Sequence, residues 1–284
     1  MNRRLFLKAA AVGALGALGA LGVLGGGIVP EARAAVPDPG NEDLVRLALT
    51  RTRQFQEHLE GDIFLDPARF GLLESTIQRF QRLQTLVGHA QFHLMNFDEA
   101  LAVARNRPQV GAFPREETDF LDAIFHETAT TYGFMGQKPL NNITDRIPPK
   151  EVTKVAATGN FLYKGAAVKL YKQIQRDIGP KVVLTSGVRS VPKQFLLFLT
   201  KTYQASGNLS LASRSLAPPG YSYHGIGDFD VGQVGYGQAN FTARFVESEV
   251  FQRLQRFEYT RLRYPKDNLL GVRFEPWHIK VVSS

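Results

Sequence analysis

Two stretches near the C-terminal end of this 284-residue chain hold the residues best suited to chemistry. The first, GYSYHGIGDFDVG, places His224 before two carboxylates, Asp228 and Asp230. The second, EPWH, contains Glu275 and His278. The chain has six histidines and no cysteine, so any transition-metal site must be built from His, Asp and Glu side chains.

The EPWH stretch must bend if both of its ionisable residues are to face one site. Residues three apart in a regular strand point to opposite sides, and proline is poorly tolerated inside a central strand. We therefore expect a bend at Pro276 that turns Glu275 and His278 into the same site, with Trp277 packed beneath them. The chain also has no G-x-S-x-G motif, no cysteine nucleophile and no P-loop, which makes a catalytic zinc site the economical interpretation.

A third stretch, TSGVRS, supplies a cation. The apolar, β-branched run at 181–187 predicts a short strand that ends at Gly187, and Ser190 with the following proline predicts the start of a helix. This arrangement projects Arg189 from the rim of a sheet. Its guanidinium could bind a carboxylate or an oxyanion, but on this motif alone a surface salt bridge is the favoured interpretation.

The remaining chain predicts the elements that position these residues. Apolar spacings of three and four predict helices through much of 42–105, including one that starts at Asp66-Pro67 and one over 97–106. Further elements are a helix at 115–132, a helix at 162–177, the helix after Ser190, a helix at 246–257 and a closing strand at 271–282. Strands separated by helices and long loops predict an α+β fold with a small sheet.

His89 and His93 fall in the N-terminal helical region, four residues apart. A helix would place them on one face as a possible metal pair. The glutamate that accompanies such a pair in zinc hydrolases is absent, so a surface or packing role is the favoured interpretation.

The N-terminal 34 residues are typical of an export signal rather than of a folded domain. Arg3, Arg4 and Lys8 precede a Gly/Ala/Leu run, and Ala32-Arg33-Ala34 fits the small-x-small cleavage rule. The paired arginines resemble a twin-arginine signal, with an ordinary secretory signal as the alternative. The apolar run is also just long enough to serve as a retained membrane anchor. We expect removal, and hence a mature protein without a membrane segment, in the periplasm or cell envelope.

The number and distribution of charged residues argue only against a nucleic-acid-binding protein. Of the 34 basic and 26 acidic residues, 4 and 1 lie within residues 1–34, which leaves a net charge of +5. The basic residues are scattered rather than gathered into a stripe that would follow a nucleic acid. A modest positive field suits an anionic partner such as a cell-wall polymer, although a generic solvated surface would look the same.

Taken together, the motifs SGVRS with Gln194, SRSLAPPGYSYHGIG followed by an aspartate, and EPWH resemble a known family. They are similar to the D-alanyl-D-alanine carboxypeptidases of the vancomycin-resistance type. These belong to a zinc superfamily that also includes D,D-dipeptidases, lysostaphin-like endopeptidases and hedgehog domains. The resemblance covers about residues 150–284 and does not extend to the helical segment 42–112.

The resemblance implies a role for each matching residue. His224 and His278 would be zinc ligands. Glu275 would be the general base, which takes a proton from the attacking water and later delivers it to the departing amine. Arg189 would bind and polarise the substrate near the scissile carbonyl. Two further positions, Ser222 and Gln194, would line the substrate pocket.

Two departures from the family pattern affect this assignment. Val188 stands where the family usually has tyrosine. The metal aspartate of the family lies seven residues after the first histidine, whereas Asp230 lies at +6 and Asp228 at +4 from His224. We prefer Asp230 as the third ligand, because its D-V-G context continues as the family pattern does. Asp228 would face the same side of a strand and is the less favoured substitute, or a residue that orients a ligand histidine.

The sequence thus predicts an N-terminal signal at 1–34, a helical segment at 42–112 and a zinc metallopeptidase domain at 113–284. The fold expected is a small antiparallel sheet with flanking helices that carries the zinc site, as in hedgehog and D,D-peptidase domains. The expected function is that of a secreted zinc D,D-carboxypeptidase, which removes a C-terminal D-amino acid from peptidoglycan stem peptides. An endopeptidase or dipeptidase on the same scaffold is the first alternative.

A non-catalytic cell-wall-binding protein is the second alternative, suggested by the shortened spacing between histidine and aspartate. Calcium binding by the D-F-D run is disfavoured, because calcium prefers many oxygen ligands. The sequence makes no prediction about oligomeric state.

Overall fold

The computed structural model describes residues 7–9 and 41–282, and most of the chain in these ranges forms short helices and three small sheets. The α-helices are α1 Glu42–Arg53, α2 Phe70–Val87, α3 His89–Phe92, α4 Phe97–Asn106, α5 Arg115–His126, α6 Ala166–Ile178, α7 Val191–Gln204, α8 Leu209–Ser213 and α9 Glu249–Leu254. The strands are β1 Leu7–Ala9, β2 Ile63–Leu65, β3 Val152–Lys154, β4 Phe161–Tyr163, β5 Val182–Ser186, β6 Phe229–Gln233 and β7 His278–Ile279. Short 3₁₀ helices are η2 Pro67–Arg69, η3 Ala129–Tyr132, η4 Pro149–Glu151, η5 Tyr223–Gly225, η6 Gly237–Phe241 and η7 Ala243–Glu247.

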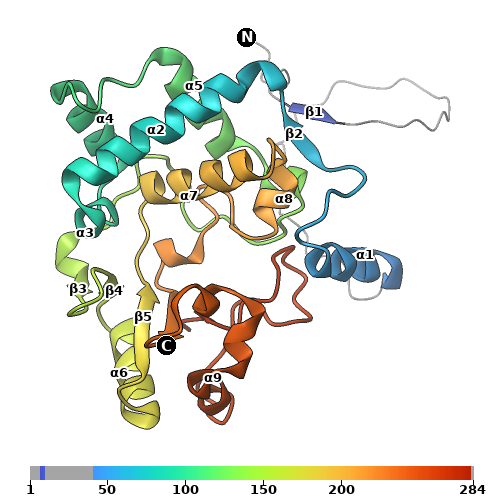
Figure 1. Ribbon diagram of the computed structural model, residues 1–284, viewed down its shortest axis with the longest axis vertical. Coiled ribbons are helices and arrows are strands. Elements are labelled where there is room, and N and C mark those ends of the chain that lie inside the picture. Colours follow the sequence, from blue (N-terminus) through green and yellow to red (C-terminus); the bar gives the residue numbers. More distant parts are fainter. Residues whose placement is uncertain (1–6, 10–40, 283–284) are drawn as a thin grey trace, which may run out of the picture.

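The helices α2, α4, α5 and α7 gather in one half of the molecule (Figure 1). Their shared core is rich in aromatic rings. Phe195 of α7 stacks on Phe80 of α2 with ring centroids 6.1 Å apart, and it also contacts Phe97 of α4 and Phe125 of α5. All four rings are buried, so α7 is held in place by helices from the N-terminal part of the chain.

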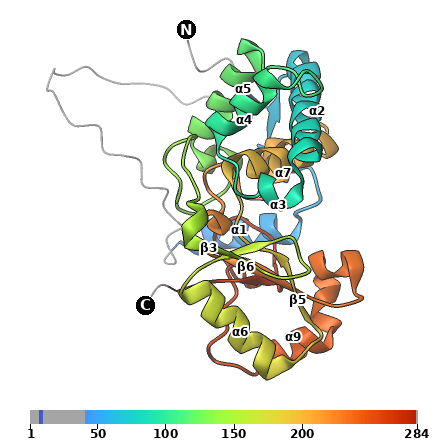
Figure 2. The ribbon, with the colours of Figure 1, turned by 90° about the vertical axis from the view of Figure 1, so that its left-hand side faces the viewer.

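The other half contains the three-stranded antiparallel sheet, whose strand order is β5-β6-β7. The helices α6 and α9 lie at the end of this half, away from α2, α4 and α5 (Figure 2). Leu184 of β5 and Val231 of β6 are paired and buried in the core that α6 and α9 cover. On the next rungs, Ser186 pairs with Asp230, and Asp230 pairs with His278. Because directly paired residues in an antiparallel sheet point to the same face, these three side chains gather on one side of the sheet.

Several elements predicted from local pattern are confirmed. The strand expected at 181–187 is β5, and the helix expected after Ser190 is α7, whose first backbone N–H groups are capped by the Ser190 hydroxyl, which accepts from Lys193 N. The helix expected over 97–106 is α4, with a capping box between Asn96 and Glu99. The α+β class with a small antiparallel sheet and flanking helices is confirmed as well.

Three element predictions are wrong in extent. The closing strand at 271–282 is reduced to His278–Ile279, because the chain turns at Pro276 and Trp277, where His278 N donates to Glu275 O. The helix predicted over 115–132 ends at His126 and is followed by η3. The helix predicted over 162–177 begins only at Ala166, after a positive-φ glycine and the strand β4.

The N-terminal signal predicted at 1–34 lies outside the described residues except for Leu7–Ala9, which pair with β2. Within the described part of the chain, no helix combines the length and the apolar character needed to cross a bilayer. The division of the chain at residue 113 stays a prediction. Helices from both sides of that point pack in the same core around Phe195.

Candidate metal centre

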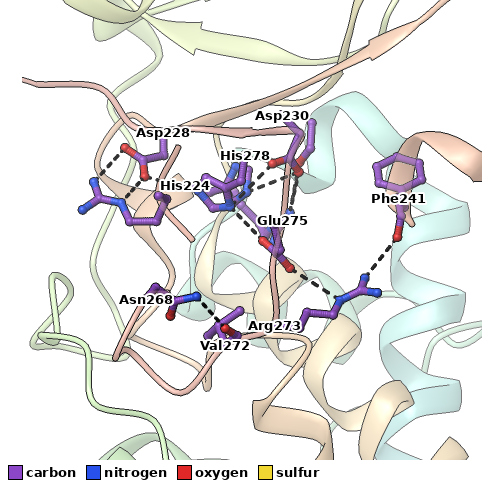
Figure 3. Close-up of polar contacts among 12 residues, drawn as sticks. His224, Asp228, Asp230, Phe241, Asn268, Val272, Arg273, Glu275 and His278 are labelled. Carbon is purple, nitrogen blue, oxygen red and sulfur yellow. Dashed lines mark hydrogen bonds and ion pairs between the residues drawn. The ribbon is translucent and has the colours of Figure 1, made fainter. Parts of the chain in front are cut away.

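Three of the sequence-predicted residues meet on the face of the sheet that carries Ser186, Asp230 and His278. His224 lies in η5, Asp230 in β6 and His278 at the start of β7, and all three are buried. One potential ligand atom from each lies within 4.8 Å of the others (Figure 3). Among the described residues this is the one such group of at least three His, Asp or Glu side chains.

The hydrogen bonds of the two histidines fix which ring nitrogen faces the group. The Nδ1 of His224 lies 2.9 Å from the carbonyl oxygen of Gly187, and a carbonyl can only accept, so this nitrogen carries the hydrogen. The Nε2 of His278 likewise donates to Asp228 Oδ2 at 3.2 Å. The remaining nitrogens, Nε2 of His224 and Nδ1 of His278, lie 3.4 Å and 3.6 Å from the oxygens of Asp230.

This arrangement fits a metal ion of the zinc type. Tetrahedral zinc with ligands at about 2.0–2.1 Å requires ligand atoms roughly 3.3 Å apart, close to the two distances observed. Asp230 Oδ1 is buried and has no hydrogen-bond partner, so a cation would satisfy an otherwise unpaired oxygen. Although burial opposes ionisation, His224, His278 and Arg189 hold the pKa of Asp230 below its ordinary value.

Asp228 is fully engaged elsewhere. Its carboxylate accepts from Arg263 Nε at 2.6 Å and Nη2 at 3.0 Å, from the backbone N–H of Val281, and from His278. Burial alone would raise its pKa, but these hydrogen bonds lower it to about 2. Asp228 and Asp230 lie on opposite sides of the histidine pair (Figure 3), and Asp228 precedes β6 rather than sharing a strand face with Asp230. The expectation that the two carboxylates face the same side of a strand is therefore wrong.

The two histidines are shifted in opposite directions by these surroundings. Burial lowers the pKa of His224, and the nearby guanidinium of Arg189 lowers it further. Burial would also lower the pKa of His278, but its hydrogen bonds to Asp228 and Glu275 raise it to about 9. Asp228 thus orients His278 and makes it electron-rich, which is what an acidic partner does for a metal-binding histidine.

Glu275 lies beside the three potential ligands, as the bend at Pro276 requires. Its Oε2 is 3.1 Å from His278 Nδ1, and its Oε1 is 4.0 Å from the Nε of Arg273. Trp277 is buried in the core beneath, where it packs with the apolar residues of the sheet. The bend therefore places a carboxylate at the edge of the group without using it as one of the three.

Arg189 projects from the end of β5 towards the same group. Its Nη2 donates to Ser186 Oγ at 3.1 Å and lies 3.8 Å from Asp230 Oδ2, while Nη1 donates to Gln194 Oε1 at 3.1 Å. Its buried Nε has no partner. Gln194 in turn donates to the carbonyl of Ala217, so it holds Arg189 and the 214–222 loop together. The surface salt bridge favoured for Arg189 on its motif alone is wrong, because the residue is buried.

The backbone of the SGVRS stretch is locked against β4. A Cβ at Gly187 would lie 2.0 Å from the carbonyl oxygen of Phe161, and the same oxygen accepts from Val188 N at 2.7 Å. Only glycine allows this close approach, which also aims the Gly187 carbonyl at His224. Val188, where the family pattern has tyrosine, is buried against Ile147 and Val152.

Arg189, His224, Asp230, Glu275 and His278 line one cavity of about 660 Å³, a size typical of sites for small ligands, whereas Asp228 and Gln194 do not line it. Ser222 lines it as the sequence predicts, and so do His89 and His93, which do not join the potential metal group. Arg273 also lines it and was not predicted. It lies two residues before Glu275, and in an extended chain this spacing puts two side chains on one side, which is the signal that could have identified it.

The site lies within the part of the chain that matches a known family. Residues 163–284 match the family model VanY, described as D-alanyl-D-alanine carboxypeptidase. No curated protein is significantly similar to the chain.

Solved structures of related peptidases are similar to about half of the chain. A point mutant of a vancomycin-resistance D,D-pentapeptidase VanY, in complex with Zn(II), is 25% identical over 51% of this chain and 86% of its own, with a TM-score of 0.38. VanYB in complex with D-alanine-D-alanine is 26% identical over 51% and 85%, with a TM-score of 0.39. The LdcB LD-carboxypeptidase is 21% identical over 48% and 70%, with a TM-score of 0.38.

Proposed function

We propose that the protein is a zinc-dependent D,D-carboxypeptidase. The match of residues 163–284 to the VanY D-alanyl-D-alanine carboxypeptidase family supports this proposal. It would remove a C-terminal D-amino acid from peptidoglycan stem peptides. The observation that carries the proposal is the fixed orientation of two histidines. Each has one ring nitrogen bound to a protein acceptor outside the group and the other within 3.6 Å of an Asp230 oxygen, and the second nitrogen of His278 also lies 3.1 Å from Glu275.

His224, Asp230 and His278 would hold the zinc, leaving one position of a tetrahedral site for water or substrate. When bound there, zinc would lower the pKa of water and polarise a peptide carbonyl. Asp228 would hold the His278 ring in place and keep its Nε2 protonated, so that Nδ1 offers the lone pair.

Glu275 would carry the protons of the reaction. Its carboxylate is beside the proposed ligands and also lines the cavity, so it can accept a proton from the attacking water and deliver it to the departing amine. Arg189 would stabilise the negative charge that develops on the scissile carbonyl oxygen, since its buried Nε lacks a partner within the protein. Ser222 would line this pocket, and Gln194 would hold Arg189 in place by accepting a hydrogen bond from it.

The protein would reach its substrate by export. The segment 1–34, with its paired arginines and small-x-small end, supports delivery to the periplasm or cell envelope. Expression of the full chain in a bacterial host, followed by fractionation and N-terminal mass analysis, tests this. Processing after Ala34 is expected, and an unprocessed chain in the membrane fraction would instead identify a retained anchor.

The activity test pairs substrate cleavage with metal analysis. The purified, zinc-loaded protein is incubated with a pentapeptide that ends in D-Ala-D-Ala, and free D-alanine is measured by mass spectrometry. Glu275→Gln is expected to lower the rate of release by roughly 10²- to 10⁴-fold while zinc content stays the same, since general-base catalysis contributes about this much. Glu258→Gln, which changes an exposed carboxylate outside the cavity, serves as the matched control.

Three results would overturn or redirect the proposal. A folded protein that binds no zinc and releases nothing is not a metallopeptidase. Release of larger fragments from intact cell wall, without free D-alanine, identifies an endopeptidase. A Glu275→Gln variant as active as the parent protein removes Glu275 from the role of general base.

A further inference from the structure

The cavity continues past the proposed metal centre along α7, into a recess whose residues play no part in the proposed chemistry. Lys193, Leu197 and Lys201 line it at intervals of four, so they lie on one face of the helix. His93, which directly follows α3, lines the cavity near Lys193. We call the buried pocket formed by Lys193 and His93 the Lys193 recess.

The Lys193 ammonium is buried without a counter-ion. The residue is only 9% exposed, and its Nζ donates to the Gln84 amide oxygen at 2.7 Å. No carboxylate forms an ion pair with it in the part of the chain that the structure describes. Burial, and then the nearby positive charge of Arg189, lower the pKa of Lys193 to about 8. A bound anion would relieve both effects.

His93 completes the recess with an unpaired nitrogen. The residue is 7% exposed, and its Nδ1 has no hydrogen-bond partner. Burial, followed by the charges of Lys193 and Arg189, lowers the pKa of His93 to about 3. A bound anion would offset the positive charges of Lys193 and Arg189. His93 Nδ1 could then be protonated and donate a hydrogen bond to the anion.

The recess is rigid, because the backbone around it is tied down. Ser190 N donates to His93 O at 3.0 Å, and Ser190 Oγ donates to Phe92 O at 2.9 Å. The end of α3 is thereby fixed to the start of α7. A site whose donors are already in place loses little entropy when a ligand binds.

Unpaired buried polar atoms are concentrated around this cavity. Among the described residues, every buried side-chain nitrogen or oxygen without a partner belongs to a residue that lines it, with the exception of Ser213 Oγ. Unpaired buried polar groups are rare in proteins, so their concentration here indicates a polar ligand that spans more than the metal centre.

We propose that the Lys193 recess binds a carboxylate of the peptide substrate, separate from the carbonyl that is cleaved. This inference rests on the proposed peptidase function and adds a specificity element from outside the family-matched segment, since His93 precedes residue 163. The carboxylate has two possible sources, the C-terminus of the departing residue or an acidic side chain elsewhere in the peptide.

Three peptides distinguish the two sources. The first contains one glutamate and ends in D-Ala-D-Ala with a free carboxylate, the second is its C-terminal amide, and the third has glutamine in place of glutamate. Dissociation constants are measured by calorimetry with zinc-loaded Glu275→Gln protein, which removes turnover from the measurement. Binding of one neutralised peptide is expected to be about 10- to 100-fold weaker, the loss typical of a charged hydrogen bond.

Lys193→Met, added to the same protein, tests the assignment. It is expected to weaken binding of the acidic peptide by a similar factor and to abolish the preference between that peptide and its neutral counterpart. Lys193→Arg is expected to retain the preference, because it keeps the charge. Lys169→Met, on the exposed surface of α6, is the control for loss of a lysine. His93→Phe provides a second variant that leaves the Gln84 contact in place, and thermal melts verify that each variant is folded.

The outcomes separate this inference from the proposed function. Equal binding of all three peptides by the parent protein, or a preference that persists in Lys193→Met, overturns the recess as a carboxylate site even if D-alanine is released. A preference that depends on Lys193, in a protein that releases no D-alanine, supports the recess and refutes the carboxypeptidase. Absence of binding to any of the peptides refutes both.

Discussion

Replacement of Asp228 by asparagine discriminates between a metal ligand and a residue that orients one. The carboxylate accepts four hydrogen bonds, two from the Arg263 guanidinium, one from His278 Nε2 and one from Val281 N. Asparagine has one acceptor oxygen, so its NH₂ group would face two of these donors. The variant keeps the shape of the side chain and removes its charge and half of its accepting capacity.

The structure sets two magnitudes for Asp228→Asn. The Arg263 side chain is 12% exposed, so removal of its charged partner leaves a largely buried cation and should lower the free energy of unfolding by about 3–5 kcal/mol. Zinc affinity should fall by about 10- to 100-fold, the effect of losing the partner of a ligand histidine, or roughly 1.4–2.7 kcal/mol. Asp230→Asn should behave differently, with loss of stoichiometric zinc because a ligand charge is gone.

The assay is a competition titration against a chromophoric chelator, run on both variants at a temperature where each is folded. Urea unfolding of the metal-free proteins supplies the stability change separately. Zinc retained by Asp230→Asn and lost by Asp228→Asn would reverse the assignment of the third ligand. Unchanged zinc affinity in Asp228→Asn would refute the role of Asp228 in orienting His278.

Two further predictions concern buried charges. Because the pKa of metal-free His278 is raised to about 9, zinc must displace a proton from its Nδ1 when it binds. The zinc affinity should therefore rise about tenfold per pH unit between pH 6 and 9. Zinc titrations at several pH values that show no such slope would exclude His278 as a ligand. Asp62→Asn should lower the free energy of unfolding by about 3–5 kcal/mol, since it leaves the buried Arg214 unpaired, whereas Asp43→Asn, in an exposed pair, should change it little in the same urea titration. Equal effects of these two substitutions would show that burial of the pair does not determine its contribution.

The Asp62–Arg214 pair also shows how the N-terminal segment supports the site. Arg214 O accepts from Arg273 N at 2.8 Å, and Arg273 lies over the ring of Phe55 with its guanidinium carbon 4.9 Å from the centroid. Residues before α2 therefore brace the loop and the arginine that border Glu275. The motifs that resemble the peptidase family contain no sign of this, because its contacts join residues about 150 positions apart.

Local elements were predictable where neighbouring residues define them. The cap at Ser190, the helix α4 and the strand β5 depend on residues within a few positions of one another, and all three were identified. The length of the closing strand was overestimated, because an apolar run around a proline has the pattern of a strand. In the structure the chain turns at Pro276, which brings Glu275 and His278 together.

The sequence by itself determined the chemistry available to this protein. It has no cysteine, it has histidines and carboxylates in two spaced motifs and Arg189 in a third, and the resemblance of these motifs to a zinc peptidase family implied a His/Asp metal site with Glu275 and Arg189 nearby. The tertiary structure decided which atoms face that site. The partner of His224 is Gly187 and the partner of His278 is Asp228, 37 and 50 residues away, and such hydrogen bonds exist only once the strands are assembled. The same assembly buries Lys193 and His93 in one recess, because α3 and α7 meet only in the folded chain.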